Sequence, residues 1–184
     1  MKEQLTLKNG RTVWLKSAEE SDAAALAAHF RQAGGETDFL SFGADDCPYT
    51  EESCRLFIRE SLTDGAEAVL VAYADGVLIG EARLIAAARK RFCHTAELAI
   101  SVLREYHAQG LGTVLLRELL RYAKAHGCDS VHLTVDADNA VALALYRRFG
   151  FSEYGRYARA SYYGGEYHDT IYMCRYFSRE EELQ

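Results

Sequence analysis

The sequence has no apolar run close to the roughly 20 residues that a membrane-spanning helix needs, so no association with a membrane is expected. Residues 1–11 alternate charged and apolar side chains and lack the apolar centre of a signal peptide. An excess of basic residues is missing too, because 21 Lys and Arg face 27 Asp and Glu, which gives a formal net charge of -6. A nucleic-acid partner normally requires a basic face. These absences predict a cytosolic (cytoplasmic) protein that binds neither membranes nor nucleic acids.

The chain also lacks the residue spacings of metal sites. Its five cysteines are odd in number, widely separated and never arranged as C-x-x-C, and its six histidines never form H-x-x-x-H or H-E-x-x-H. We therefore expect core thiols instead of disulfides, and no metal. The chain does have a large apolar content: 184 residues, 49% of them hydrophobic, suit one compact domain over residues 1–184.

Hydrophobic periodicity predicts an α+β fold, built as an α/β three-layer sandwich of strands and helices. Asp75 and Gly76 form a hairpin turn signal, Gly34 and Gly35 should end the first helix, and Thr50 should cap the second. Strands are expected at 12–16, 68–73, 77–87, 92–102 and 130–135, and helices up to about residue 33, at 50–62, at 111–126 and from 138 or 139 to 149.

The most informative stretch is 97–126, in which a strand runs into a helix through the loop HAQGLG at 107–112. Gly110 and Gly112 permit torsions and close approaches that a Cβ would forbid. Free N–H groups at the start of the helix, together with the helix dipole, would form a phosphate site. A tight strand-to-helix turn explains these six residues equally well, so the interpretation depends on what surrounds them.

A second informative stretch, DADNAVALALYRRFGF at 136–151, predicts a short helix that ends at Gly150. Asn139, Ala142 and Tyr146 share one stripe of this helix, which can present an amide and a phenol to a common ligand. Taken singly, Asn139 is better read as a helix cap and Tyr146 as a half-buried aromatic residue. The stripe expected to face the core consists of Val141, Leu145 and Phe149.

Together, the two stretches resemble the GNAT superfamily of N-acetyltransferases. Residues 102–112 match V-x-x-x-x-[QR]-x-x-G-x-G except at His107, and residues 139–151 match N-x-x-A-x-x-L-Y-x-x-x-G-F. The ending resembles a branch of small-molecule amine and amino-acid acetyltransferases, through Gly155, Arg156, Gly165, Tyr167, Asp169 and Met173. The resemblance implies a mixed, mostly antiparallel sheet with splayed central strands and flanking helices.

The resemblance further implies that the chain binds acetyl-CoA as cosubstrate. Its pyrophosphate would lie on backbone amides at 109–113, and its pantetheine arm would pair with the strand edge at 100–102, which needs strands that splay, with a bulge near Ser101. His107 is mostly uncharged at neutral pH, so a charge-assisted phosphate contact would be lost there and binding weakened. The expected cofactor-binding residues are Ile100, Ser101, Val102, His107, Ala108, Gln109, Gly110, Leu111, Gly112, Thr113, Asn139, Ala142 and Tyr146.

Acetyl transfer to an amine needs a base, a group that polarises the thioester carbonyl and an acid for the leaving thiolate. Tyr146 resembles the general acid of the family, and the Val102 N–H can polarise the carbonyl. Glu97 matches a carboxylate proposed as base in some members, acting directly or through water if desolvation raises its pKa. His132 is a weaker candidate for the base. The expected activity is therefore that of an acyl-CoA-dependent N-acyltransferase, by direct attack in a ternary complex.

The acceptor is left open between a free amino acid, a polyamine, a drug-like amine and a protein amino terminus or lysine. An acidic and aromatic loop at 36–49 favours a small cationic amine. Exposed carboxyl-terminal strands favour a homodimer. Two other classes compete with the enzyme: a non-catalytic acetyl-CoA sensor, which the retained Tyr146 disfavours, and a dinucleotide-binding enzyme, which Leu115 in place of the third glycine of G-x-G-x-x-G disfavours.

Overall fold

A computed structural model describes residues 2–63, 67–86, 89 and 91–178 of the chain. The strands are β1 (Lys2–Thr6), β2 (Thr12–Ser17), β3 (Ala68–Ala74), β4 (Val77–Ala86), β5 (Thr95–Val102), β6 (Ser130–Asp136), β7 (Ser152–Tyr163) and β8 (Glu166–Tyr176). The helices are α1 (Ala23–Glu36), α2 (Glu51–Thr63), α3 (Leu111–Ala125) and α4 (Ala140–Arg148), with 3-10 turns η1 (Glu20–Asp22) and η2 (Arg104–Tyr106).

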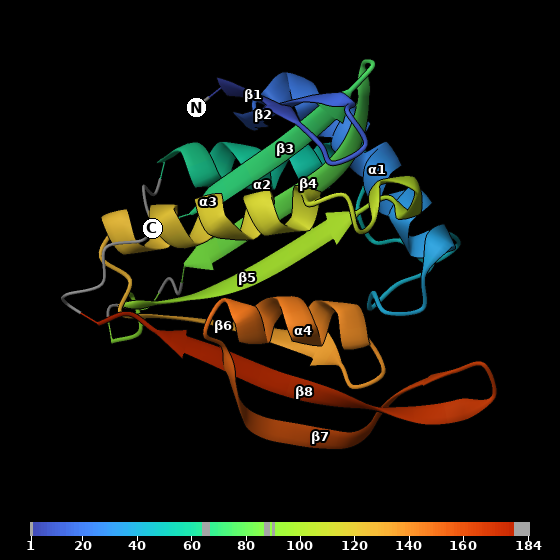
Figure 1. The fold of residues 1–184 in the computed structure, drawn as a ribbon, viewed down its shortest axis with the longest axis vertical. Coiled ribbons are helices and arrows are strands. Elements are labelled where there is room, and N and C mark those ends of the chain that lie inside the picture. Colours follow the sequence, from blue (N-terminus) through green and yellow to red (C-terminus); the bar gives the residue numbers. More distant parts are fainter. Residues whose placement is uncertain (1, 64–66, 87–88, 90, 179–184) are drawn as a thin grey trace.

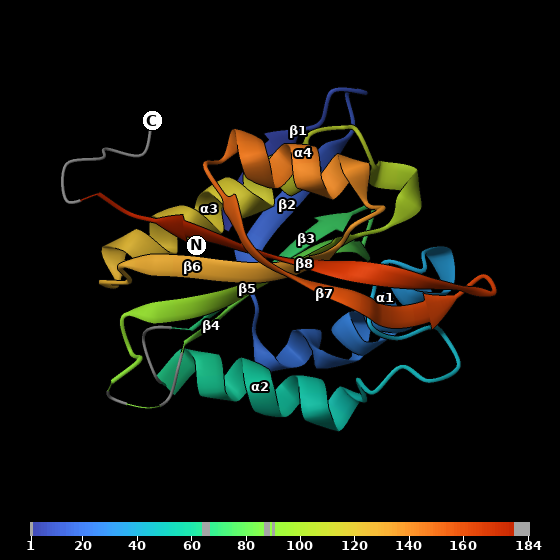
Figure 2. The same ribbon diagram turned by 90° about the horizontal axis from the view of Figure 1, so that it is seen from below.

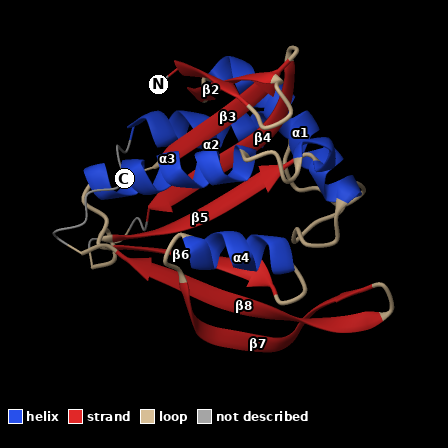
Figure 3. Cartoon of the chain, viewed as in Figure 1, coloured by secondary structure: helices blue, strands red, loops and turns tan. Residues whose placement is uncertain are grey.

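The strands form one sheet in the order β1-β2-β3-β4-β5-β6-β8-β7, antiparallel except where β5 meets β6 (Figure 1). Helices α3 and α4 cover one face of the sheet, and α1 and α2 cover the other (Figure 2). This arrangement confirms the predicted mixed, mostly antiparallel sheet flanked by helices (Figure 3). No helix within the described ranges is both long and apolar enough to cross a membrane.

The core follows from the amphipathic helix α3, whose leucines pack against the sheet. Leu111, Leu115 and Leu119 are fully buried, as their i, i+4, i+8 spacing predicts, and Leu116 and Leu120 widen the apolar stripe. A second cluster lies between α1, α2 and the other face of the sheet. The buried cysteines belong to this interior as thiols, namely Cys54, Cys128 and Cys174, whereas Cys93 is exposed.

Two predictions from local signals are confirmed: the cap of α2 and the turn between β3 and β4. The Ser53 N–H donates to Oγ1 of Thr50 at 3.1 Å, which confirms the predicted cap of α2. Asp75 and Gly76 both have positive φ, at 50° and 81°, and join β3 to β4 as the turn signal predicted.

Several predicted boundaries are wrong. The segment 2–6 forms β1, which charge alternation had not suggested, and residues 92–94 are turn instead of strand. Gly34 and Gly35 do not end α1, which continues to Glu36. At Gly34 a Cβ would lie 2.9 Å from the Gly43 backbone, so glycine is needed there for close approach of the following loop. Residue 87, the predicted end of β4, lies outside the described residues.

The predicted core stripe of α4, of which Leu145 and Phe149 do pack against the core, is wrong at Val141. Val141 is 77% exposed, whereas Leu143 and Tyr146 are buried and Leu145 and Phe149 only partly so. The apolar residues of so short a helix occupy most of its circumference, so spacing alone could not choose between overlapping faces. The consequence for function is that Tyr146 lies in the interior.

Candidate active site

The centre of the sheet opens into a wedge between β5 and β6, which we call the splay. The two strands pair only at Thr95–Ser130, Ala96–Val131 and Glu97–His132 and then diverge (Figure 1). The predicted bulge near Ser101 is wrong, because the register between β4 and β5 runs without a shift from Ala86–Ala96 to Gly80–Val102. The strands therefore separate because the pairing with β6 ends, while β5 stays fully paired with β4.

The register shows which backbone groups of β5 face the splay. Just beyond the strand, the Leu103 N–H donates to the Ile79 carbonyl of β4 at 2.9 Å. Because alternate residues of an antiparallel strand point to the same neighbour, Ser101 also points its backbone groups to β4, whereas Ile100 and Val102 point theirs into the splay. The open edge can thus pair with an extended ligand that carries amides.

Helix α3 begins at the open end of the splay, and no side chain caps its N-terminus. Gly110, the N-cap residue, has φ 95°, which favours glycine, and contributes no side chain. Its carbonyl accepts from the Val114 N–H, whereas the N–H groups of Leu111, Gly112 and Thr113 have no hydrogen-bond partner among the described residues. Three free N–H groups at the positive end of a helix dipole form an anion site.

Two cationic side chains flank this helix end, and sequence reasoning missed both. Lys8 and Arg148 line, with Gln109, Gly110 and Thr113 among others, a cavity of about 300 Å³. Nη2 of Arg148 donates to Oγ1 of Thr113 at 2.7 Å, and the Lys8 N–H donates to the Gln109 carbonyl at 3.2 Å. An acidic protein thereby places positive charge where an anion would bind. The sequence carried no signal for Lys8, since only the fold brings the β1–β2 turn to α3.

Side chains of the loop before α3 turn away from the helix end. Nε2 of His107 donates to the Val102 carbonyl at 2.8 Å, and Nε2 of Gln109 donates to the Glu105 carbonyl at 2.7 Å. Ala108 has φ 59°, an uncommon value for a residue with a Cβ. The predicted role of His107 toward a phosphate stays a prediction, and the structure gives its ring a backbone partner.

Tyr146 of α4 reaches the interior on the α3 side of the sheet. Its side chain is buried, its ring packs against Phe151, and its hydroxyl has no hydrogen-bond partner among the described residues. Burial, reinforced by the nearby Glu81 carboxylate, raises the pKa of Tyr146 to about 12. The phenol therefore stays protonated and can donate a proton.

Asn139 caps α4, as predicted for this residue taken singly: its Oδ1 accepts from the Ala142 N–H at 3.1 Å. The two hydrogens on its Nδ2 remain available to a ligand. Ala142, on the same stripe, is partly buried. These residues and Tyr146 lie on one side of α4, as the spacing predicted.

Glu97 and His132, the two candidate bases, form the last pair before β5 and β6 separate. Glu97 is exposed, at the closed end of the splay. Since Ser101 contacts α1, alternation along the strand places Glu97 on the α1–α2 face as well. The structure thus brings both candidates to one end of the site and buries neither.

The acidic and aromatic loop at 36–49 serves two different purposes. Phe42 and Tyr49 pack with Phe30 in the second core cluster, and Tyr49 also lines, with residues of α1, a cavity of about 610 Å³. Glu36 is the last residue of α1 and accepts from the Arg104 N–H at 2.6 Å. Asp38 is the loop residue that acts near the splay, through its charge on Tyr163 at the end of β7.

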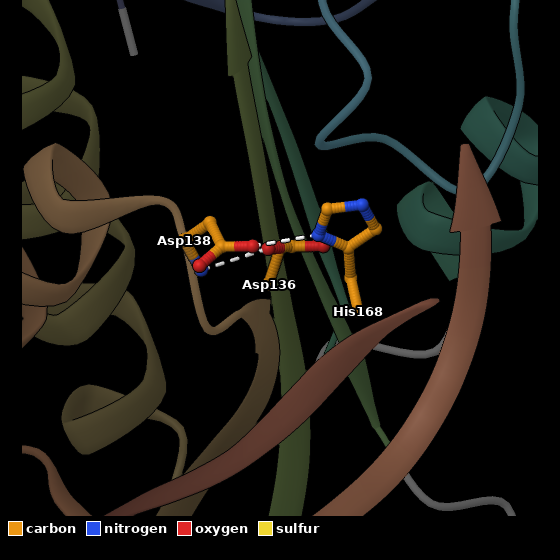
Figure 4. Close-up of side chains that lie close together, drawn as sticks. All are labelled: Asp136, Asp138 and His168. Atoms are coloured by element: carbon orange, nitrogen blue, oxygen red, sulfur yellow. Dashed lines mark hydrogen bonds and ion pairs between the residues drawn. The ribbon is translucent and has the colours of Figure 1, made fainter. Parts of the chain in front are cut away.

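Carboxylates gather where β6 ends, at the mouth of the splay. Asp138 lies 2.6 Å from Nδ1 of His168, and Asp136 accepts from the Asp138 N–H at 2.8 Å (Figure 4). Asp136 also accepts from the Tyr163 hydroxyl at 3.1 Å. Burial, the Asp136 hydrogen bond and the charges of Asp136, Asp138 and Asp38 raise the pKa of Tyr163 to about 12. The ligand atoms of Asp136, Asp138 and His168 lie within 4.8 Å of one another, but they are used on one another and on Tyr163. We call this group the clasp, because it ties the β7–β8 hairpin to the segment before α4.

Comparisons with known proteins agree with this geometry. Residues 36–151 match the family model described as Acetyltransferase (GNAT) family. The L-amino acid N-acetyltransferase AaaT of Escherichia coli is 33% identical over 58% of this chain and 66% of its own length, so that the match spans slightly less than two thirds of that relative.

Two solved structures extend the likeness over most of the chain. A GNAT-family acetyltransferase from Streptococcus pneumoniae is 31% identical, with a TM-score of 0.85 over 90% of this chain and 99% of its own. The structure of yncA from Salmonella typhimurium with acetyl-CoA shares the fold at 20% identity, with a TM-score of 0.79 over 91% of this chain and 95% of its own. With the family model and a relative of this identity both covering more than half of the chain, the protein belongs to the acetyltransferase (GNAT) family.

Proposed function

We propose that the protein transfers the acetyl group of acetyl-CoA to the primary amine of a small molecule, by direct attack in a ternary complex. One observation carries the proposal: β5 and β6 diverge after Glu97–His132, which leaves an open edge of β5 that leads to the uncapped N-terminus of α3, and Tyr146 is buried on the neighbouring α4. A protein of this fold has been solved with acetyl-CoA, and a curated relative is an L-amino acid N-acetyltransferase.

The residues present fit acetyl-CoA. The free N–H groups of Leu111, Gly112 and Thr113 would receive its pyrophosphate, aided by Lys8 and Arg148. Leu111 is fully buried, so only its backbone takes part. The remaining loop residues of the predicted set, His107, Ala108, Gln109 and Gly110, would shape the turn that presents these amides.

The open edge of β5 would hold the pantetheine arm. Ile100 and Val102 offer the backbone groups that face the splay, whereas Ser101 offers none to that side. The His107 ring already occupies one lone pair of the Val102 carbonyl. From α4, Asn139 would donate an amide hydrogen from Nδ2, and Ala142 would leave room for the arm.

Acetyl-CoA supplies the activated acetyl group, and three functions of the chain act on it. An N–H of Ile100 or Val102 polarises the thioester carbonyl, and the Tyr146 hydroxyl donates its proton to the leaving sulfur. Glu97 takes the proton of the amine, directly or through water, as the sequence predicted. Its exposure argues for the route through water.

The mouth of the splay favours a cationic acceptor. Three carboxylates, those of Asp38, Asp136 and Asp138, act on Tyr163 at this point, although two of them also hold the clasp together. Negative charge at the mouth attracts an ammonium group before it loses its proton. An amino acid or a polyamine presents such a group.

The test is thiol release from acetyl-CoA in the presence of amino acids, polyamines or amino-terminal peptides. We expect one class of amine to stimulate release by the wild type, and Tyr146→Phe to lose about 100-fold, because the general acid is gone. Tyr176→Phe is the matched control, since Tyr176 is 75% exposed and pairs with Ser130 at the closed end of the splay.

Each outcome separates the hypotheses. A full rate in Tyr146→Phe would remove Tyr146 from the chemistry. Calorimetric binding of acetyl-CoA with no release by any amine would support the sensor instead, and stimulation only by peptides would point to protein acetylation. Absence of acetyl-CoA binding would exclude the proposal altogether.

A further inference from the structure

A hydrogen-bonded chain of three buried polar side chains lies on the face of the sheet opposite α3. Nε2 of His29, from α1, is 2.8 Å from Oγ of Ser101, and Oγ of Ser101 is 2.9 Å from Oε1 of Glu81 on β4. Nδ1 of His29 lies 3.3 Å from the Leu78 carbonyl. Exposure falls from 8% at Ser101 to 2% at His29 and 1% at Glu81, so Ser101 is the outermost member. None of the steps described above uses this chain.

The number of protons in this chain decides what it can do. A carbonyl only accepts, so the His29–Leu78 contact requires a proton on Nδ1, and neutral His29 then offers a lone pair at Nε2. The single proton of Ser101 can reach either His29 or an ionised Glu81, but not both. With one proton added at Glu81, the carboxylic acid donates to Ser101, and Ser101 donates to His29. The buried chain therefore lacks one proton until Glu81 is protonated.

The environment of Glu81 favours protonation of its carboxylate. Burial raises the pKa of Glu81, against the opposing effects of the Arg83 charge and the Ser101 hydrogen bond. Burial likewise lowers the pKa of His29 to about 4, so the ring is neutral at physiological pH. Arg83 does not depend on Glu81 alone, because its guanidinium lies 4.9 to 5.5 Å from the ring centres of Phe30, Tyr49 and Phe57. The other titratable or charged groups that act on this chain are Glu36 on α1, Arg83 on β4, Cys54 on α2 and Tyr146 on α4.

The position of Ser101 connects this chain to the splay. Ser101 stands between Ile100 and Val102, the two residues whose backbone groups face the open edge. A ligand anchored at α3 and laid along that edge would leave the α1–α2 face for the acceptor. The Ser101 hydroxyl, which contacts His29 of α1, lies on this face. Across the splay, the charge of Glu81 acts on Tyr146. Glu97, by contrast, lies four residues away from Ser101, about 13 Å along a strand.

We propose that Ser101 accepts the proton of the acceptor amine and relays it to Glu81, with His29 as the positioning residue that fixes the serine hydroxyl. The inference rests on the proposed function and replaces Glu97 as the base of that reaction.

The protons balance in this scheme. The ammonium group gives one proton to Oγ of Ser101 while the serine proton passes to Oε1 of Glu81, so the serine is unchanged and the carboxylate becomes a carboxylic acid. The amine nitrogen bonds to the acetyl carbon, the C–S bond breaks, and Tyr146 protonates the sulfur. The second proton of the nitrogen restores Tyr146, and Glu81 returns its proton to solvent. One proton is released for each amide formed.

The test compares kcat/KM of the wild type and Ser101→Ala between about pH 6.5 and pH 9.5, with whichever amine stimulates thiol release. A primary amine has a pKa near that of lysine, about 10.4, so at high pH it loses its proton without help. We expect Ser101→Ala to be about 100-fold slower at the low end of this range and only a few-fold slower at the high end. Glu81→Gln should show the same convergence.

Controls separate the relay from a structural role. Ser101→Thr keeps a hydroxyl and should restore most of the rate, and Ser130→Ala removes another buried serine of the sheet, outside the relay, and should leave the pH profile unchanged. Calorimetry should give all variants the acetyl-CoA affinity of the wild type. A ratio between wild type and Ser101→Ala that stays constant with pH, or no deficit at all, would overturn the relay alone. A wild type that releases no thiol with any amine would overturn the proposed function, and the relay with it.

Discussion

Two helices begin beside the splay, and only one of their N-termini is capped by a side chain. At α4 the Asn139 side chain accepts the Ala142 N–H, and the clasp holds the preceding segment. At α3 the N-cap is Gly110, which offers no side chain, and three N–H groups are left without partners among the described residues. A helix end that is left open in a folded protein is available to a ligand, whereas one that is capped is already satisfied. The contrast indicates which of the two ends binds the anion.

The largest expected effect, on acetyl-CoA affinity, comes from adding a side-chain cap to the N-terminus of α3. In Gly110→Asp a carboxylate occupies the N-cap of α3 and competes with the pyrophosphate for the same N–H groups. We expect acetyl-CoA affinity to fall about 100-fold, which corresponds to about 2.7 kcal/mol and to the loss of one or two charge-assisted hydrogen bonds. Titration calorimetry measures it.

The matched control for this variant is Gly110→Asn. Asn has nearly the same shape as Asp, tolerates the left-handed backbone found at φ 95°, and carries no charge. Its affinity should fall clearly less than that of Gly110→Asp. Equal losses in the two variants would attribute the effect to backbone strain and would argue against an anion at this helix end.

The same contrast shows what the sequence could and could not predict. The strand-loop-helix pattern around Gly110 and Gly112 identified the open helix end, because glycine and hydrophobic periodicity are local signals. The splay followed from the resemblance, yet its cause did not: a bulge was expected near Ser101, and the structure shows instead that pairing with β6 ends after Glu97. Pairing between strands far apart in sequence is not a local property.

Burial was the harder quantity to predict. Val141 looked like a core residue of α4 and is exposed, and Glu81 showed no pattern that set it apart from surface residues. Lys8 and Arg148 likewise meet at α3 only because the fold brings three distant segments together. Charged and polar groups that are brought together by tertiary contacts therefore could not be predicted from the sequence, whereas the cap at Asn139 and the glycine loop before α3 could.

A smaller effect, on stability, is expected from removing the side-chain cap of α4. Asn139→Ala removes the cap of α4 and should lower the free energy of unfolding by about 1 kcal/mol. Asn139→Asp keeps an oxygen for the Ala142 N–H but loses the amide hydrogens, so its stability should stay near that of the wild type. Urea denaturation measures stability, and calorimetry measures acetyl-CoA affinity.

The two Asn139 variants also decide whether this residue serves the ligand. If Nδ2 contacts acetyl-CoA, both variants bind it more weakly, although only Asn139→Ala is less stable. Unchanged affinity in Asn139→Asp would reduce Asn139 to a helix cap and remove it from the predicted cofactor-binding set.

The smallest effect concerns the clasp that holds the segment before α4. Hydrogen bonding to Asp138 raises the pKa of His168. A raised pKa in the folded state means that the pair stabilises the protein fully below the unfolded histidine pKa of about 6.5, and that this contribution is lost as pH rises through the folded value. Asp138→Asn should therefore lower Tm more at about pH 5.5 than at about pH 8.5, with Asp45→Asn, which removes an exposed loop carboxylate, as control. Because Asp138 is largely exposed, the difference should be small and should shrink further in high salt. A Tm difference that is the same at both pH values would mean that His168 is held by its stacking on Tyr163 and the backbone contact alone, and that the segment before α4 does not depend on the charge of the clasp.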